Sequence, residues 1–305
     1  MTEKTFDSED VRKALESLYA AQRLDAPDQA VTEAPIFNIA LGPVCETPAG
    51  WLPSVCVTVP AYESAEVPGT LERSFIDYWP ETTYEDDDPD DARQGRPLEY
   101  GSWFYNEAMK YQAPELHRLR IEAFQAAEVL YRWSAAAGNV QAVVNLGYIY
   151  SYDRCEGLYW DRVLRALEGD ATAGAWECPR DEWAYACFAY GAEHGNDEAC
   201  YKLGDFQKQG RGCLPDEAAA FKSYQRAYEL AKTWNNGSWG PSALRLGTCY
   251  EEGAGCDPDF EQARHWYGIA RAGLSIMVNA GTWYYRRSLK QAEDGAKRMD
   301  QELAG

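Results

Sequence analysis

One short phrase of sequence occurs twice in the second half of the chain, and it restricts the fold more than any other feature. A Leu203-Gly204 step is followed by glycines at positions 210 and 212, and the same pattern returns 43 residues later. The second copy has its steps at Leu246, Gly247, Gly253 and Gly255. Repetition at a fixed spacing is typical of arrays in which each repeat is one supersecondary unit.

Two shorter copies flank this pair. Upstream, Ala135–Gly138 is followed by Val144–Gly147, and downstream, Ala272-Gly273 is followed by Val278–Gly281. Four copies exceed the roughly three repeats that a stacked array needs to bury a continuous core. The sequence therefore predicts about four helix-turn-helix pairs.

The glycines of the phrase have a physical reason. A glycine in mid-helix costs about 1 kcal/mol relative to alanine, so its repeated use indicates close packing. We expect the first helix of each pair to press on the second at these glycines: Gly147, Gly204, Gly247 and Gly281. The Gly-x-Gly steps fit helix ends, where a left-handed residue satisfies the last carbonyls, and Pro215 and Pro258 fit the next helix starts.

The phrase resembles the Sel-1-like repeat, a relative of the tetratricopeptide repeat. The resemblance rests on an alanine with Trp-Tyr at Ala263, Trp266 and Tyr267, on Gly138-Asn139 and Gly195-Asn196, and on the Leu-Gly and Gly-x-Gly steps. It covers about residues 115–290 and implies a mainly α fold, a right-handed α-α superhelix. The family unit of about 36 residues further implies an insertion at about 152–181 and a shorter one between the next two copies.

The N-terminal third has a different composition and hydrophobic pattern. Residues 8–24 read as an amphipathic helix, and the proline-rich stretch 25–97 contains two short alternating runs, 36–41 and 54–59, that predict a strand pair. The stretch is either a separate domain or a cap over the first repeat, and the need of terminal repeats for a cover favours the cap. We therefore expect a cap region at 1–114 and a repeat solenoid at 115–305, closed by a last helix at about 282–303.

Charge and apolar content restrict the partners. The net charge of −20 argues against nucleic acid and anionic membranes. Residues 81–91 hold seven carboxylates, either a solvated loop or a patch for a basic partner. Without an apolar run of membrane-spanning length or an N-terminal export signal, the chain is expected to be soluble and cytoplasmic. Its nine cysteines are then expected to be free thiols, with Cys213 and Cys256 too far apart to pair.

Catalytic motifs are not found in the sequence. Three histidines are present, His117, His194 and His265, and the motifs of metalloproteases, serine hydrolases and phosphate-binding loops are missing. We expect no enzyme, no cofactor and no metal site, with a dyad of Cys45 or Cys56 and His117 as a remote alternative. The alternative function is a weak hydrolase or a cell-wall-ligand binder, like the cysteine-rich relatives of the repeat family.

A candidate binding site lies on the first helix of each repeat. In the aligned copies, Trp133, Tyr190 and Arg226 occupy one position, and these residue types dominate interaction hot spots. Together with Arg132 and Glu193 they predict a concave surface that binds a peptide or protein segment, which agrees with the non-catalytic scaffold role that the resemblance implies. The alternative is that the insertion after Ser151 or the proline-rich cap folds over these side chains.

Overall fold

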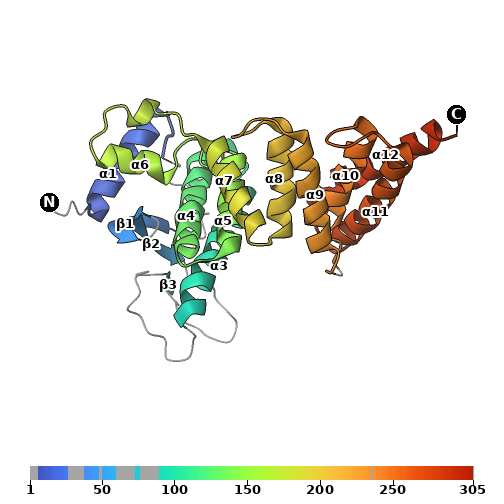
Figure 1. Cartoon of the computed structure of the whole chain (residues 1–305). Coiled ribbons are helices and arrows are strands. Elements are labelled where there is room, and N and C mark those ends of the chain that lie inside the picture. Colours follow the sequence, from blue (N-terminus) through green and yellow to red (C-terminus); the bar gives the residue numbers. More distant parts are fainter. Residues whose placement is uncertain are drawn as a thin grey trace, which may run out of the picture. The chain divides into compact units, whose positions relative to one another are not determined.

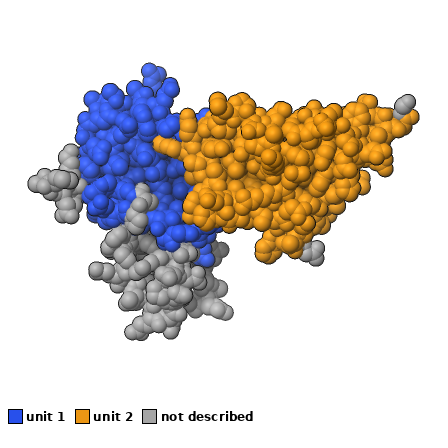
Figure 2. Space-filling view, in the orientation of Figure 1, with its two compact units in different colours: residues 1–180 blue, residues 181–305 orange. Residues whose placement is uncertain are grey.

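The chain is organised as two compact units. The computed structural model describes residues 6–26, 38–47, 50–59, 73–75, 89–234 and 236–304. Residues 1–180 form unit 1 and residues 181–305 form unit 2 (Figure 2). The sequence-based boundary near residue 114 differs from this division because α3 (Pro89–Lys110) packs along α4 (His117–Ala136), so the first repeat helices and the cap region share unit 1.

The N-terminal helix of unit 1 forms as expected. α1 spans Ser8–Ala21, and the Asp7 carboxylate accepts from the backbone N–H groups of Glu9 and Asp10. The Asp10 carboxylate accepts from the Asp7 N–H in return, which completes a capping box. The apolar face is buried at Val11, Leu18 and Tyr19.

The predicted strand pair is a hairpin with a third strand. β1 (Asn38–Thr47) and β2 (Gly50–Val59) are antiparallel, and β3 (Arg73–Phe75) pairs with the far end of β2, in the order β1-β2-β3. β3 reaches only Val57 to Val59 of β2. Among the described residues, the first part of β2, at Trp51–Pro53, therefore has no strand paired to its edge opposite β1. Residues 81–88 of the acidic stretch lie outside the described part, and α3 begins at Pro89.

Helices make up the rest of both units (Figure 1). In unit 1, α4 is followed by α5 (Val140–Ser151) and α6 (Trp160–Leu167). Unit 2 holds α7 (Arg180–Glu193), α8 (Asp197–Gln209), α9 (Glu217–Ala231), α10 (Gly240–Glu252), α11 (Phe260–Asn279) and α12 (Arg286–Glu302), with short 3₁₀ turns at 114–116, 173–175 and 283–285. The mainly α fold of helix-turn-helix repeats is confirmed. In the described ranges, no helix is both long and apolar enough to cross a membrane.

Side chains in the repeated phrase start the helices. The side chains of Asn139 and Asn196 cap α5 and α8, because each accepts a hydrogen bond from the backbone N–H three residues later in the chain. Asp216 caps α9 in the same way. Pro215 therefore precedes the cap instead of occupying the first helical turn as expected. Pro258 stands in the same place before Asp259, the cap of α11.

Several mid-helix glycines, including Gly204 and Gly247, lie under a tyrosine ring. A Cβ atom added at Gly204 would lie 2.5 Å from the ring of Tyr224, and at Gly247 it would lie 2.8 Å from the ring of Tyr267. The partner helix is thus the one that follows the glycine, not the first helix of the same pair as the sequence suggested. The same contact joins Gly101 of α3 to Tyr131 of α4 at 2.7 Å. We call α4, α7, α9 and α11 the ring helices, because Tyr131, Phe188, Tyr224 and Tyr267 occupy this aligned position.

The expected fourth junction is wrong. α11 continues through Ala272 and Gly273 to Asn279, and Gly281 follows the helix with a φ of +99° instead of lying in mid-helix. Gly273 packs on the connection before α10, where an added Cβ would lie 2.9 Å from the carbonyl oxygen of Gly237. The connection between α9 and α10, where the repeat spacing implies a short insertion, therefore packs against the extended part of α11 through Gly237 and Trp239.

Each Gly-x-Gly step ends one helix and packs against the first turn of the helix before it. Gly210 and Gly253 are left-handed C-caps of α8 and α10, as expected. The second glycine of the first step, Gly212, has a φ of +65°, and a side chain there would collide with the backbone carbonyl of Asp181 in the first turn of α7. Gly255 lies in the same way against the carbonyl of Glu217 in α9.

The C-terminal end of unit 2 is held from both sides of one ring. Tyr267 lies between Gly247 of α10 and Gly295 of α12, where an added Cβ would lie 2.7 Å from the ring. The Tyr267 hydroxyl donates to Glu251, and Arg298 makes two hydrogen bonds of 2.8 Å to the same carboxylate. These hydrogen bonds with Arg298 lower the pKa of Glu251. Tyr267 and Glu251 therefore fix α12 against α10 and α11.

Replacing Gly204 by alanine tests the glycine contact. Alanine is the better helix former by about 1 kcal/mol. Overpacking costs about 1–3 kcal/mol, so we expect a net loss of about 1 kcal/mol and a lower urea midpoint by circular dichroism. The control is Gly268→Ala in α11, where an added Cβ meets no atom within 4 Å, and it should leave the midpoint unchanged or raised. Equal midpoints for the two variants would contradict the contact as the cause.

Glu251 makes the stability of unit 2 depend on pH. Because the pKa of Glu251 is lowered from 4.5 in the fold, its contribution is present above that pH and is lost as the pH falls through the folded pKa. We expect Glu251→Gln to lower the unfolding free energy by about 1 kcal/mol at pH 7 and by much less near pH 3. Urea denaturation at both pH values measures this, with the exposed Glu293→Gln as control. A Glu251→Gln effect that is constant with pH would contradict the assignment.

Candidate protein-interaction surface

The ring helices share one face whose residues can be compared directly, because the ring over the glycine sets their register. Six positions around each ring lie on one side of its helix. We call them the ring-helix face: Gln125, Glu128, Val129, Arg132, Trp133 and Ala136 in α4; Glu182, Tyr185, Ala186, Ala189, Tyr190 and Glu193 in α7; Ala218, Phe221, Lys222, Gln225, Arg226 and Glu229 in α9; Glu261, Arg264, His265, Gly268, Ile269 and Ala272 in α11. All five predicted binding residues belong to this face.

In unit 1 the face of α4 is covered by the rest of the unit. The indole Nε1 of Trp133 donates to the carbonyl of Pro53 in β2 at 3.0 Å. The indole of Trp160 in α6 donates to the carbonyl of Trp51 at 2.7 Å. The two indoles thus occupy the edge of β2 that β3 does not reach. The predicted residue Trp133 is held by the cap region, as the alternative interpretation proposed.

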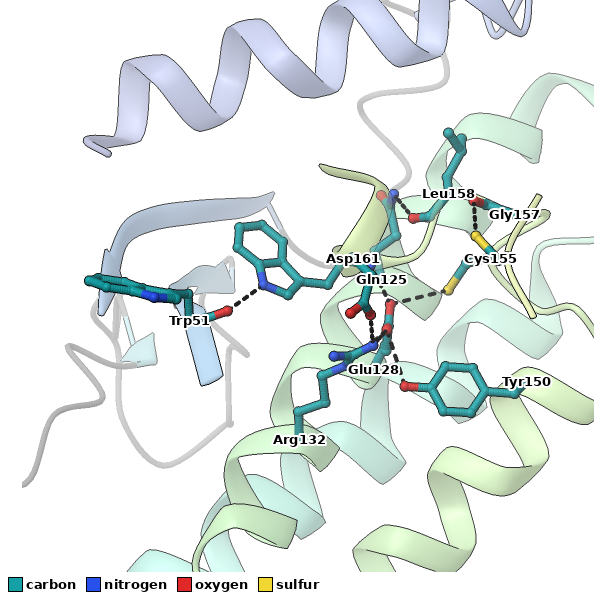
Figure 3. A network of polar contacts seen from close by, with 11 residues as sticks. Trp51, Gln125, Glu128, Arg132, Tyr150, Cys155, Gly157, Leu158 and Asp161 are labelled. Carbon is teal, nitrogen blue, oxygen red and sulfur yellow. Dashed lines mark hydrogen bonds and ion pairs between the residues drawn. The ribbon is translucent and has the colours of Figure 1, made fainter. Parts of the chain in front are cut away.

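Arg132 belongs to a buried polar network between α4, α5 and α6 (Figure 3). Its guanidinium pairs with Asp161 of the insertion and with Glu128 one turn earlier, whose side chain is fully buried. The Glu128 carboxylate also accepts from the backbone N–H of Trp160 at 3.1 Å and from the Tyr150 hydroxyl at 3.4 Å. Because Tyr159 offers no side-chain cap, Glu128 serves as the cap at the amino end of α6.

The electrostatics of this network reflect burial. Burial raises the pKa of Glu128, although the nearby charge of Arg132 acts in the opposite direction. Burial also raises the pKa of Cys155, and this keeps its thiol protonated, whereas nucleophilic attack needs the thiolate. Sequence reasoning missed Glu128. The available signal was an acidic residue with arginine four positions later inside the mainly apolar stretch Ala126–Trp133.

In unit 2 the face of α7 and α9 is open. Tyr190 is 39% exposed and stacks on His194, with ring centroids 4.0 Å apart. Glu193 and Arg226 are exposed, and the Arg226 guanidinium donates to the Glu193 carbonyl at 3.5 Å. That hydrogen bond links α7 to α9. Tyr190, Glu193 and Arg226 therefore form one exposed surface with an aromatic ring, a carboxylate and a guanidinium.

The face of α11 continues this surface with different chemistry. Its six residues line an open hollow with a volume of about 610 Å³. Glu261, Arg264 and His265 are exposed at one end, and Gly268 lies beside Ile269. Arg264 pairs with Asp300 of α12 at 3.1 Å, with both side chains more than half exposed.

The residues of the alternative dyad have other neighbours. His117 Nε2 lies 2.9 Å from both carboxylate oxygens of Glu156. The Cys45 thiol approaches the carbonyl of Pro43 at 4.0 Å, and the side chain of Cys56 lies outside the described residues. Among the residues whose placement is described, no cluster of three or more metal-ligating side chains is found. Cys213 and Cys256 are free thiols, as expected.

Comparisons with known proteins agree with this geometry. The family model of the Sel1 repeat matches residues 197–232 and 240–272, which are α8 with α9 and α10 with most of α11. Each match therefore starts with the helix that carries the mid-helix glycine, α8 or α10. It ends with the ring helix whose tyrosine packs on that glycine, α9 or α11. An uncharacterised Sel1-like repeat-containing protein of Schizosaccharomyces pombe is 28% identical over 141 residues, 46% of this chain and 20% of the relative. The chain spans about a fifth of the length of this curated relative.

Two solved structures are similar in part. A Sel1 repeat protein from Oxalobacter formigenes has a TM-score of 0.32 and 21% identity, over 53% of this chain and 91% of the other. A protective antigen of uropathogenic Escherichia coli with an SLR fold has a TM-score of 0.31 and 22% identity, over 66% of this chain and 48% of the other. The two matched stretches, residues 197–232 and 240–272, show that the chain contains Sel1-like repeats in unit 2.

Proposed function

We propose that the chain is a non-catalytic scaffold that binds a peptide or protein segment on the ring-helix face of unit 2. Sel1-like repeats generally mediate protein–protein interaction. The observation that supports a particular surface is the difference in burial between equivalent positions. On α4 the face is covered by β2 and α6, and Glu128 and Val129 are 0% and 1% exposed. On α7 and α9 the corresponding residues are half-buried at Tyr185 and Phe221 and exposed at Ala186 and Lys222. Tyr190 and Arg226, one turn later, are also exposed.

Within this surface, Tyr190 and Arg226 are the residues proposed to carry the affinity. An aromatic ring and a guanidinium can be desolvated by a partner and still make directed contacts, which is why tyrosine and arginine are frequent hot spots. Glu193 adds a carboxylate next to them. Arg132 and Trp133, which were grouped with these residues on sequence grounds, are proposed to hold the cap region and not the partner.

The charge of the chain suggests the kind of partner. A net charge of −20 favours association with a segment that carries basic residues and disfavours nucleic acid and anionic membranes. Cysteines described as free, including the buried Cys155, Cys200 and Cys249, fit a reducing compartment such as the cytoplasm. The partner's identity does not follow from these properties.

A double substitution tests the surface. We expect Tyr190→Ala with Arg226→Ala to weaken capture of natural partners from the cell's own lysate at least tenfold, about 1.4 kcal/mol, because two central contacts are lost. The helical circular dichroism signal should be unchanged, since both side chains are exposed. Quantitative mass spectrometry of the captured proteins provides the measurement.

The matched control is Trp283→Ala with Arg287→Ala, an exposed aromatic and arginine near the start of α12. This control should retain the partners captured by the parent chain. Equal capture by both double variants would contradict the proposed surface. Failure of the parent chain to enrich any protein would count against the scaffold function itself.

A further inference from the structure

Two of the helices that cover α4 each bring a carboxylate to one of its arginines. The Arg132 guanidinium pairs with Asp161 of α6. Two turns before the ring-helix face begins, the Arg118 guanidinium pairs with Glu16 of α1. The side chains of Arg118 and Arg132 are 12% and 16% exposed. Unit 1 therefore shows what covers the cations of a ring helix in this fold, namely a segment with carboxylates at the matching places.

The open face of α9 carries two cations that have no such cover. Lys222 and Arg226 lie one turn apart at the middle of the face, and both are exposed. The Arg226 guanidinium donates to the uncharged backbone carbonyl of Glu193, and within the described ranges neither cation pairs with a carboxylate. On α11 the situation differs, because Arg264 already pairs with Asp300. The positive charge of α9 is therefore left for a partner to neutralise.

The carboxylates of the open face lie at its first and last positions. They are Glu182 and Glu193 on α7, Glu229 on α9 and Glu261 on α11. The middle positions of these three helices hold neutral or cationic side chains, although the whole chain has a net charge of −20. A partner that lies on the middle of α9 takes water from two unpaired cations, which is unfavourable unless the partner supplies negative charge there.

We propose that the face of α9 binds a partner segment that carries two acidic residues, whose carboxylates pair with Lys222 and Arg226. This inference rests on the proposed scaffold function, since it names the class of segment bound. The pairing repeats the contacts that hold α6 and α1 on α4. Basic residues next to the acidic pair reach Glu193 and Glu229 at the end of the face, and they offset the repulsion that the net charge of the chain exerts on an acidic partner.

A labelled peptide of sequence Lys-Gly-Asp-Tyr-Asp-Gly-Lys tests the inference on the full-length chain. In an extended peptide its two aspartates lie on one side about 7 Å apart, close to the rise of about 6 Å between Lys222 and Arg226. Fluorescence anisotropy gives the affinity, and we expect saturable binding that weakens as salt screens the exposed charges. The same peptide with asparagine in place of both aspartates should bind at least about tenfold more weakly, because asparagine keeps the shape without the charge.

Reversing the two charges locates the binding site. Lys222→Glu with Arg226→Glu should bind the acidic peptide at least about tenfold more weakly, and should instead bind a peptide with lysine in place of both aspartates. Both side chains are exposed, so the helical circular dichroism signal should match that of the parent. The control, Arg286→Glu with Lys297→Glu, reverses one exposed arginine and one exposed lysine of α12 and should bind the acidic peptide as the parent does.

Several results would overturn the inference. They are the absence of saturable binding of the acidic peptide, equal affinity for the asparagine peptide, unchanged affinity in the α9 variant, and an equal loss in the α12 control, which would assign the effect to net charge. Each of them leaves the scaffold function standing if the parent still captures natural partners that Tyr190→Ala with Arg226→Ala loses. Loss of the scaffold function is read separately, from the absence of any partner enriched by the parent chain.

Discussion

The stacking of this fold depends on an aromatic ring that packs against a helix backbone where no side chain is present. A Cβ atom added at Gly204 or Gly247 would lie 2.5 or 2.8 Å from the ring of Tyr224 or Tyr267, so a larger residue there would push the neighbouring helices apart. Because the ring belongs to the helix that follows the glycine, the contact joins one hairpin to the next. The helix register is set at the same point, and so the positions of the exposed side chains on each ring helix are set as well.

The repeated glycines predicted this packing, and the helix caps were readable from Asn139 and Asn196 because capping is a local interaction. The partner of each glycine was not readable, since a Leu-Gly step shows that something approaches closely but not which helix approaches. The continuous α11 was missed for a similar reason. Gly273 reads as a junction in sequence, and only the packing of Gly240 against it shows that the helix passes through.

The repeat alignment puts the five predicted residues on one face of their helices, but sequence could not tell covered positions from open ones. Trp133, Tyr190 and Arg226 are aligned by the repeat, yet covering Trp133 requires a hairpin some eighty residues earlier in the chain, and such long-range contacts leave no periodic signal. The buried carboxylate of Glu128 shows the same dependence. It is satisfied by the backbone of an insertion that no repeat pattern describes.

The glycine at position 268 has a consequence for how this protein can change. It costs helix stability, about 1 kcal/mol relative to alanine, and it has no packing neighbour that requires the absence of a side chain. Selection for a more robust fold would therefore replace it readily. Such a replacement would also place a side chain in the hollow of about 610 Å³ on α11, so the shape of this surface would change before the packing of the fold did.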